Sequence, residues 1–575
     1  MTTTKPATDM LTALVRLREV LRNAPLPLEV PGVAAHRAAR DELIAQLEDY
    51  VLPRLIQIDA PLLTVVGGST GAGKSTLVNS LVGSRVSLSG VLRPTTRSPV
   101  LVHHPSDVAW FDQSRILPDL ERTADASTDT GKLQLVASDN VPPGLAILDA
   151  PDIDSVEERN RQLAAQLLAA ADLWLFVTSA ARYADQVPWE FLKAAAERST
   201  AVAVVLDRTR PEAVEEVSGH LARMLTARGL RDSPLFAVPE GQVDDEGLLP
   251  VDAVADIRSW LEMLAADAGA RAAVVRQTLD GAIRSLSRRT HPLADALAEQ
   301  AEAVTRLRAA VDTAYDDAQR EVAEAVTSGN LLRGEVLVRW QEFVGTGDLL
   351  RALESRVSQL RDRVVAGLRG RSQQIERVAV AVESGLESLI IEHAERAAEA
   401  TDRAWRGTDA GRALSESVPA ELGRASRTLR RQAEAEVRAW QEGVVEMVRA
   451  EGAGKRGTAR FLAFGVNGLG VSLMMVVFAS TGGITGAEVG VAGGTAAVAQ
   501  KVLEAVFGDQ AVRRLAERAR RDLERRVEGL LAQERRRFDE VVDALGIDPE
   551  GAARLREVTR RVDDVRFAAP EGGYA

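Results

Sequence analysis

The chain has 575 residues, which at roughly 100–200 residues per domain predicts about three to five domains. Its 83 acidic residues outnumber 71 basic ones, and the net charge of −12 argues against a general nucleic-acid binder, so we expect no nucleic-acid partner. The absence of cysteine excludes disulfides, zinc knuckles, iron–sulfur clusters and thiol catalysis. The first residues, MTTTKPATDM, lack the pattern of a secretory signal, and we expect a cytoplasmic protein.

Up to about residue 270, short apolar runs alternate with helical patterns. Residues 8–57 form a helical segment that precedes the first run. The runs predict six strands, at residues 62–66, 100–103, 145–148, 173–177, 201–206 and 235–238. Helices are predicted at 160–171, 190–198, 213–228 and 251–268. Almost wholly apolar strands are typical of a parallel sheet with both faces covered. The pattern therefore predicts a doubly wound α/β domain with a mostly parallel sheet.

The following region is helical almost without interruption. Between residues 293 and 548 the only proline is Pro419, and apolar residues recur at three- and four-residue spacing with charges between them. We expect a long all-α stalk or bundle here; a compact helical domain with no mechanical role is the alternative.

An apolar, glycine-rich segment interrupts the helical region. Residues 461–480 carry no charge and as a helix would measure about 30 Å, enough to cross a hydrocarbon core. Gly482, Gly486, Gly490 and Gly494 follow at four-residue intervals, a spacing that lets helices approach closely. We expect a hairpin that contacts membrane lipids, re-entrant because of Glu488. A buried hairpin inside the bundle is the alternative.

These patterns predict five parts of the chain. They are an N-terminal helical segment that packs with the stalk, a nucleotide-binding domain, the stalk, the apolar hairpin, and a returning stalk helix with a C-terminal tail. The predicted boundaries are 1–59, 60–268, 269–455, 456–505 and 506–575.

A glycine-rich loop follows the first predicted strand. Its sequence, GSTGAGKS, fits G-x-x-x-x-G-K-[ST] and leads directly into a helical run. Glycines let backbone N–H groups wrap a phosphate, and the helix N-terminus adds its dipole. We expect this loop to bind the phosphates of a nucleotide through Gly68, Ser69, Thr70, Gly71, Ala72, Gly73, Lys74, Ser75 and Thr76.

Two further motifs fit a magnesium site. Asp149 ends an apolar strand, the place of the Mg²⁺-water anchor in such enzymes. Residues 93–99, RPTTRSP, occupy the place of a switch loop, where a threonine can ligate Mg²⁺. We expect Ser75, Thr96 and Asp149 to hold Mg²⁺, and Lys74 and Thr96 to act in catalysis.

The motifs GSTGAGKST, RPTTR and LDAPD, in this order, resemble the first three guanine-nucleotide motifs of Era- and dynamin-related GTPases. The helical region with its apolar insertion resembles that of bacterial dynamin-like proteins. The resemblance implies a membrane-associated GTPase that uses GTP and Mg²⁺, forms a homo-oligomer or a hetero-oligomer with a related GTPase, and deforms or tethers bilayers. It implies a location at the inner face of the cell membrane.

The chain departs from the family in its water-positioning residues. The third motif is normally D-x-x-G, and Asp152 stands in place of the glycine that senses the γ-phosphate. Ile153 follows where Ras-like enzymes place a glutamine. Thr70 and Gly71 occupy the places of the glutamine and serine that position water in dynamins. We therefore expect slow intrinsic hydrolysis that assembly stimulates.

The base-reading motif, normally N-K-x-D, is replaced by residues 207–210, DRTR. We expect Asp207 and Arg208 to lie at the nucleotide, but Arg210 replaces the guanine-reading aspartate. Asp207 or Asp185 could substitute for it. The preference for guanine therefore follows from the resemblance alone, and the residues leave ATP open.

Two alternatives to a slow GTPase remain at this point. The first is a nucleotide-binding scaffold with little turnover, which the altered third and fourth motifs favour. The second is a P-loop ATPase with coiled helical arms, which Arg210 makes conceivable.

Overall fold

The computed structural model describes most of the chain. The described residues are 5–87, 98–112, 117, 120–127, 129, 131–155, 157–197, 201–328, 335–344, 372–418, 422–453, 459–479 and 491–568. They divide into two compact units. The first comprises Met1–Leu26, Gly32–Ala298 and Asp548–Ala575, and the second comprises Pro27–Pro31 and Glu299–Ile547.

The first unit is built on an eight-stranded sheet of order β3-β4-β2-β5-β1-β6-β7-β8. Among the strand pairs that the described residues form, only that of β2 with β5 is antiparallel, so the predicted doubly wound, mostly parallel α/β fold is confirmed. The strands are β1 (Leu62–Gly68), β2 (Val100–His103), β3 (Glu121–Thr123), β4 (Lys132–Ala137), β5 (Leu145–Asp149), β6 (Leu173–Ser179), β7 (Ala201–Thr209) and β8 (Leu235–Pro239).

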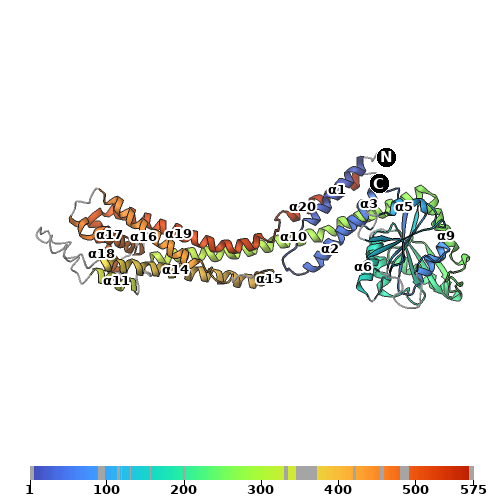
Figure 1. Cartoon of the computed structure of the whole chain (residues 1–575), viewed down its shortest axis with the longest axis horizontal. Helices are drawn as coiled ribbons and strands as arrows, with labels where there is room; N and C mark the ends of the chain where they lie inside the picture. The colour runs from blue at the N-terminus through green and yellow to red at the C-terminus, as the bar shows by residue number, and fades with distance from the viewer. Residues whose placement is uncertain are drawn as a thin grey trace. The chain divides into compact units, whose positions relative to one another are not determined.

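Helices cover both faces of this sheet, as Figure 1 shows for α6 and α9. On the chain before α10, the helices of the unit are α1 (Lys5–Arg22), α2 (Val33–Gln46), η1 (Leu47–Val51), α3 (Leu52–Ile56), α4 (Lys74–Val82), η2 (Pro105–Asp107), α5 (Val108–Phe111), α6 (Glu158–Ala169), α7 (Gln186–Glu197), η3 (Pro211–Ala213), α8 (Val214–Ala227) and α9 (Val251–Ala266). The first part of α10 (Ala268–Thr327) and α20 (Gly551–Ala568), which packs against α1, complete the unit.

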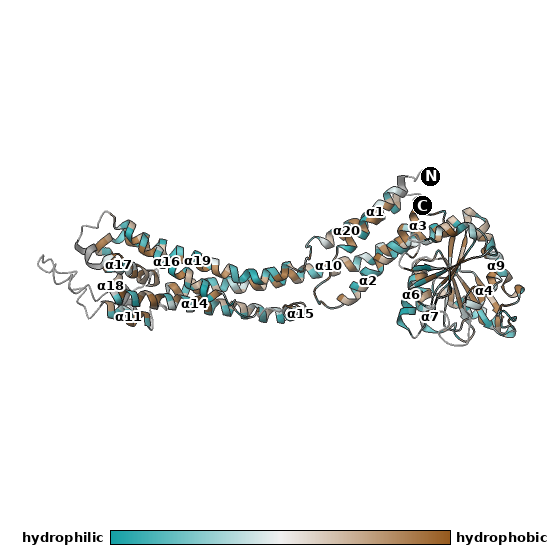
Figure 2. Cartoon of the chain, viewed as in Figure 1, coloured by the Kyte–Doolittle hydropathy of each residue, from teal (hydrophilic) through white to brown (hydrophobic). Residues whose placement is uncertain are grey.

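The sheet separates two hydrophobic cores. On β6, Trp174 and Phe176 point to the core under α6, α7 and α8, whereas Leu175 and Val177 point to the core under α4 and α9. All four side chains are buried. Because both faces are covered, the central strands β1, β5, β6 and β7 are mostly apolar, and the strands of the sheet are largely brown in Figure 2.

The structure adds two strands that the apolar pattern missed. β3 and β4 extend the sheet beyond β2, and their sequences, ERT and KLQLVA, mix polar with apolar residues. Most of their side chains are exposed or half-buried, as is common at the edge of a sheet. The six predicted strands are all present, with ends that differ by up to three residues.

The second unit is a helical bundle, so the predicted long all-α region is confirmed. It contains the second part of α10, α11 (Glu335–Val344), α14 (Ser372–Arg406), α15 (Asp409–Ser417), α16 (Leu429–Glu451), α17 (Ala459–Ala479), α18 (Val491–Phe507) and α19 (Asp509–Asp543). Hydrophilic and hydrophobic residues alternate along α16 and α19 in Figure 2. The indole Nε1 of Trp440 on α16 donates to the carbonyl oxygen of Ala519 on α19, 2.8 Å away.

The described part of the apolar segment lies in the core of this bundle. α17 packs against α16, α18 and α19, and the ring of Phe478 lies 5.8 Å from that of Trp440. The buried apolar side chains of α17 are Leu469, Val471, Leu473, Met474, Met475, Val477 and Phe478. These side chains therefore contact protein, as in the alternative of a buried hairpin.

The apolar run also departs from one continuous helix. Gly465 has φ 65° and ψ 165°, which breaks the helical path of α17. Within the described ranges, no helix combines the length and the apolar character needed to cross a membrane. Gly482, Gly486 and Gly490 of the predicted glycine stripe lie outside the described residues. The predicted hairpin and the predicted domain boundaries remain predictions.

Candidate nucleotide site

The glycine-rich loop connects β1 to α4, and two of its glycines are required by close contacts. Gly68 has φ 154°, and a Cβ there would lie 2.0 Å from the carbonyl oxygen of Val177. Gly73 has φ 99°, and a Cβ there would lie 1.9 Å from Oδ2 of Asp207. Both positions combine a backbone conformation that favours glycine with space for a hydrogen only. The loop therefore has the tight turn that wraps a phosphate.

Lys74 is a buried cation at the start of α4. Its ammonium donates to the carbonyl oxygens of Gly68 and Ser69, at 2.9 and 3.0 Å, and to the carboxylate of Asp152. Its side chain is only 5% exposed. An ammonium has three donors, and all three are used within the protein.

Asp149 ends β5 beside the loop. Its Oδ2 accepts hydrogen bonds from the hydroxyls of Ser75 and Ser87, each at 2.6 Å. Burial raises its pKa, against the lowering effect of the two hydroxyls and of Lys74. Its Oδ1 is buried and has no hydrogen-bond partner among the described residues. An unused carboxylate oxygen next to a serine hydroxyl fits the oxygen ligands that Mg²⁺ takes.

The remaining coordination positions of a bound Mg²⁺ would be filled by phosphate and water oxygens, because the described residues offer few oxygen ligands. No cluster of three or more His, Asp or Glu side chains in the described ranges could hold a metal alone. The hydroxyl of Ser75 lies 2.6 Å from the carboxylate of Asp149, whereas Thr96, the third predicted ligand, lies outside the described residues.

Two carboxylates of the segment after β5 contact the loop. Asp152 pairs with Lys74. Asp154 accepts hydrogen bonds from the backbone N–H and the hydroxyl of Thr70, at 2.6 and 2.7 Å, and from Arg182 at 2.9 Å. Asp154, Arg182 and Ser87 were not predicted from the sequence. Asp154 could have been suspected because it follows Asp152 at the next alternate position after β5. No sequence pattern indicates Ser87.

The end of β7 brings Asp207 and Arg208 to the loop. Both lie against Gly73, so they occupy the place where the base-reading motif was expected. Arg208 has φ 52°, and its N–H donates to the carboxylate of its neighbour Asp207 at 2.7 Å. Burial raises the pKa of Asp207 to about 6. Arg210 is exposed, and Asp185 lies 3.7 Å from Arg182 in an exposed ion pair.

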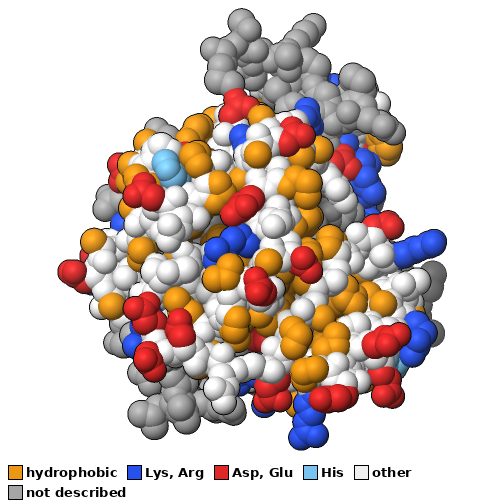
Figure 3. Space-filling view, turned by 90° about the vertical axis from the view of Figure 1, so that its right-hand side faces the viewer, with side chains coloured by type: hydrophobic (Ala, Val, Ile, Leu, Met, Phe, Trp, Pro, Cys, Tyr) orange, Lys and Arg blue, Asp and Glu red, His pale blue; other side chains and the backbone are white. Residues whose placement is uncertain are grey.

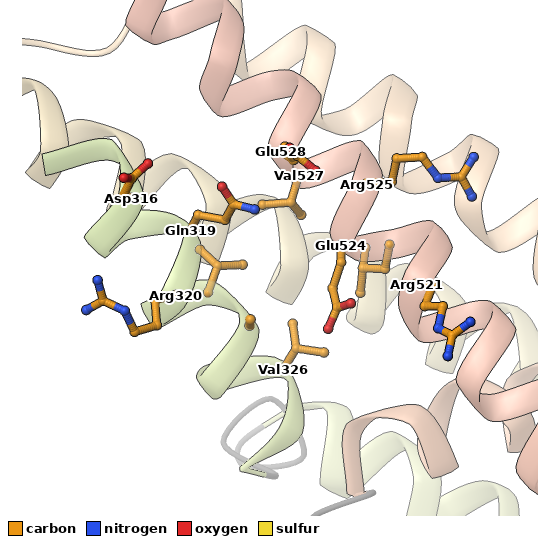
Figure 4. A pocket seen from close by; sticks show the side chains of 12 residues that line it. Asp316, Gln319, Arg320, Val326, Arg521, Glu524, Arg525, Val527 and Glu528 are labelled. Atoms are coloured by element: carbon orange, nitrogen blue, oxygen red, sulfur yellow. The ribbon is translucent and has the colours of Figure 1, made fainter. Parts of the chain in front are cut away.

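The described residues that line one further groove include none of the predicted site residues. A groove of about 420 Å³ lies between α10 and α19, with Val326 and Val527 among its lining and Arg320, Arg521 and Glu524 around them (Figure 4). On the face that Figure 3 shows, acidic and basic side chains are interspersed with apolar ones.

The sheet order, the loop between β1 and α4, and the buried lysine define a P-loop domain of the α/β class. Residues 64–208 match the model of the dynamin family. The chain therefore carries a domain of the dynamin family, and the predicted resemblance to dynamin-related GTPases is confirmed.

A curated relative supports the same family. The chain is 30% identical over 139 residues to a probable transmembrane FZO-like GTPase of the chloroplast of Arabidopsis thaliana. The match covers 24% of this chain and 14% of that protein, so the chain spans a small part of its length.

Solved structures are similar over longer stretches. One belongs to an oligomerised bacterial dynamin pair described as sensing and tethering membranes; it is 9% identical, covers 96% of this chain and 95% of the other, and has a TM-score of 0.38. Another is LeoA, a bacterial dynamin GTPase from ETEC, at 12% identity, 98% coverage of both chains and a TM-score of 0.22. Era of Aquifex aeolicus, bound to GDP and aluminium fluoride, matches 36% of this chain and 56% of its own at 18% identity, with a TM-score of 0.23.

Proposed function

We propose that this chain is a dynamin-like GTPase that binds GTP with Mg²⁺ in the loop 68–76. The observation that carries the proposal is the buried Lys74 beside the pair formed by Ser75 and Asp149. Lys74 then binds the β- and γ-phosphates. Ser75, Thr96 and Asp149 would hold Mg²⁺, which when bound neutralises the charge that develops on the phosphates. Asp207 and Arg208 lie along the base.

Hydrolysis by the isolated chain is slow in this proposal, because no side chain at the expected positions is available to orient water. Ile153 is apolar and fully buried. The hydroxyl of Thr70 is held by Asp154, and Gly71 has no side chain. Assembly of two or more copies of this chain, or of this chain with a related GTPase, supplies the side chain that orients the water.

Membrane attachment is the second part of the proposal. It is supported by the uncharged run at residues 461–480 and by the flanking Arg456, Arg460 and Lys501, each of which adds about 1 kcal/mol near an anionic surface. The site of action is the inner face of the cell membrane. Because most apolar side chains of α17 from Leu469 to Phe478 are buried in the bundle, lipid contact through them requires α17 to leave its partners.

Turnover assays test the enzyme activity. Hydrolysis of GTP and of ATP is measured with Mg²⁺ over a hundredfold range of protein concentration, with and without anionic liposomes. We expect a rate per chain that is slow when dilute and rises with concentration or liposomes, with GTP preferred. Fast hydrolysis that does not depend on protein concentration would contradict the proposal that the isolated chain lacks a group to orient water.

A nucleotide-binding scaffold is the second candidate, favoured by the ion pair of Lys74 with Asp152. It predicts tight binding with no turnover under any of these conditions. A preference for ATP in the same assays would identify the ATPase alternative.

A further inference from the structure

The three donors of Lys74 point to a competition at the phosphate loop. Two of them bind backbone carbonyls, and the third binds the carboxylate of Asp152. The ion pair is well shielded, since the two side chains are 5% and 18% exposed. A phosphate that binds Lys74 must therefore replace Asp152 as the partner of the third donor.

The backbone holds Asp152 in this place. The N–H of Ala150 donates to the carbonyl oxygen of Val66 at 3.2 Å, and that of Ile153 donates to Gly68 at 3.4 Å. Pro151 and Ile153 are buried on either side. The segment thus lies along the end of β1 and the start of the loop, and it presents Asp152 to Lys74 without help from a ligand.

Asp154 extends the same arrangement to a second donor of the loop. It accepts the backbone N–H of Thr70, one of the groups that a phosphate loop offers to its ligand, and is itself anchored by Arg182. One short segment thereby supplies carboxylate oxygens to both kinds of donor, the ammonium and the backbone N–H, in place of phosphate oxygens.

We propose that Asp152 is an internal anion that occupies the phosphate-binding lysine when no nucleotide is bound, so that a triphosphate binds only by displacing the segment 150–155. Resting on the proposed function, this inference adds a regulatory contact to the same site. The carboxylate lowers nucleotide affinity, and its expulsion by like charge couples binding to movement of the segment.

The test is equilibrium binding of a fluorescent GTP analogue, with inorganic tripolyphosphate as a competitor that has no base. Asp152→Asn removes the charge and Asp152→Gly removes the side chain. We expect both variants to bind the analogue and tripolyphosphate about tenfold more tightly than the unmodified chain. Asp152→Glu keeps a carboxylate, and we expect its affinity to stay within threefold of the unmodified chain.

A matched control separates this contact from a general charge effect. Glu158→Gln also removes one negative charge from the same domain, at an exposed side chain that pairs with Arg161. We expect it to change affinity by less than twofold. An equal gain in Glu158→Gln, or no gain in either Asp152→Asn or Asp152→Gly, overturns the inference.

The variant Lys74→Ala tests the proposed function separately from the inference about Asp152. If Lys74→Ala loses binding while the Asp152 variants bind as the unmodified chain does, the inference is wrong and nucleotide binding stands. If Lys74→Ala binds normally, both are wrong. Thermal melting of each variant verifies folding, and with two independent substitutions at Asp152 one folded variant suffices.

Discussion

Asp207 is a buried carboxyl whose ionisation opposes folding. Burial raises its pKa to about 6 from the usual 3.8, so the folded chain holds the proton more tightly than the unfolded chain. The protonated carboxyl favours the folded state. This contribution to the free energy of unfolding is complete below pH 3.8 and is lost as the pH rises through about 6. Above that pH the ionised carboxylate costs about 2–3 kcal/mol.

We therefore expect Asp207→Asn to stabilise the nucleotide-free chain above pH 6. Asparagine keeps an oxygen that can accept the N–H of Arg208, so this hydrogen bond is retained. Melting temperatures measured from pH 4 to pH 8 should show a gain that grows up to about pH 6.5 and then levels. Asp232→Asn, at an exposed position, should show no such pH dependence. A gain of equal size at pH 4 contradicts the assigned cause.

The residues of the site were predictable where one short motif contains them. Lys74, Ser75 and Gly73 belong to a single loop, and Asp149 could be placed because it ends an apolar strand. Asp154 binds Thr70 across 84 positions of the chain, and Ser87 binds Asp149 across 62. Such pairings depend on the register of the sheet, which no local pattern contains.

At the scale of elements, a buried ion pair connects α3 to the sheet. Arg54 lies 2.8 Å from Asp172, and both side chains are almost fully buried. Asp172 also accepts the N–H of Leu63 on β1 at 2.8 Å and the hydroxyl of Tyr50 at 3.3 Å. Burial raises the pKa of Asp172, and Arg54 opposes that shift.

We expect Arg54→Ala to destabilise the first unit by about 3–5 kcal/mol, because it leaves Asp172 buried without a counter-ion. Denaturant unfolding followed by tryptophan fluorescence measures the loss. Arg16→Ala, at an exposed position of α1, serves as control and should change stability by less than about 0.5 kcal/mol. The double variant Arg54→Met, Asp172→Asn should recover part of the loss. A loss below about 1 kcal/mol in Arg54→Ala would show that the pair is not needed.

The elements themselves were predictable to different degrees. Apolar runs identified β1, β2, β5, β6 and β7, because burial on both faces removes polar residues, and they also identified the half-buried edge strand β8, whose sequence LFAVP is apolar. The edge strand β3 and its neighbour β4 were missed because their side chains are mostly exposed or half-buried, so their sequences are not apolar runs. The uncharged run of α17 could not reveal whether its partner is lipid or protein, since both environments select the same residues.

At the scale of the whole molecule, the proposal requires α17 to leave the bundle before its side chains reach lipid. The chain offers a clean test because it has no cysteine. A Cβ on Gly470 of α17 would lie 3.8 Å from Cβ of Val445 on α16, the usual separation in a disulfide. The pair Gly470→Cys, Val445→Cys should therefore cross-link the two helices on oxidation.

We expect the reduced double variant to float with anionic liposomes and the oxidised one to lose most of its binding, because the cross-link holds α17 against α16. The reduced sample is the matched control for the oxidised one. Equal flotation of both forms would contradict attachment through α17, and absence of flotation in the unmodified chain would contradict membrane attachment.

The central claim is that Lys74 makes this chain a nucleotide-binding protein, and a titration of fluorescent GTP and ATP analogues against the purified chain tests it most directly. We expect saturable binding that Mg²⁺ strengthens and that falls at least a hundredfold in Lys74→Ala, while the exposed Lys193→Ala binds as the unmodified chain does. Unchanged affinity in a folded Lys74→Ala variant would contradict the account.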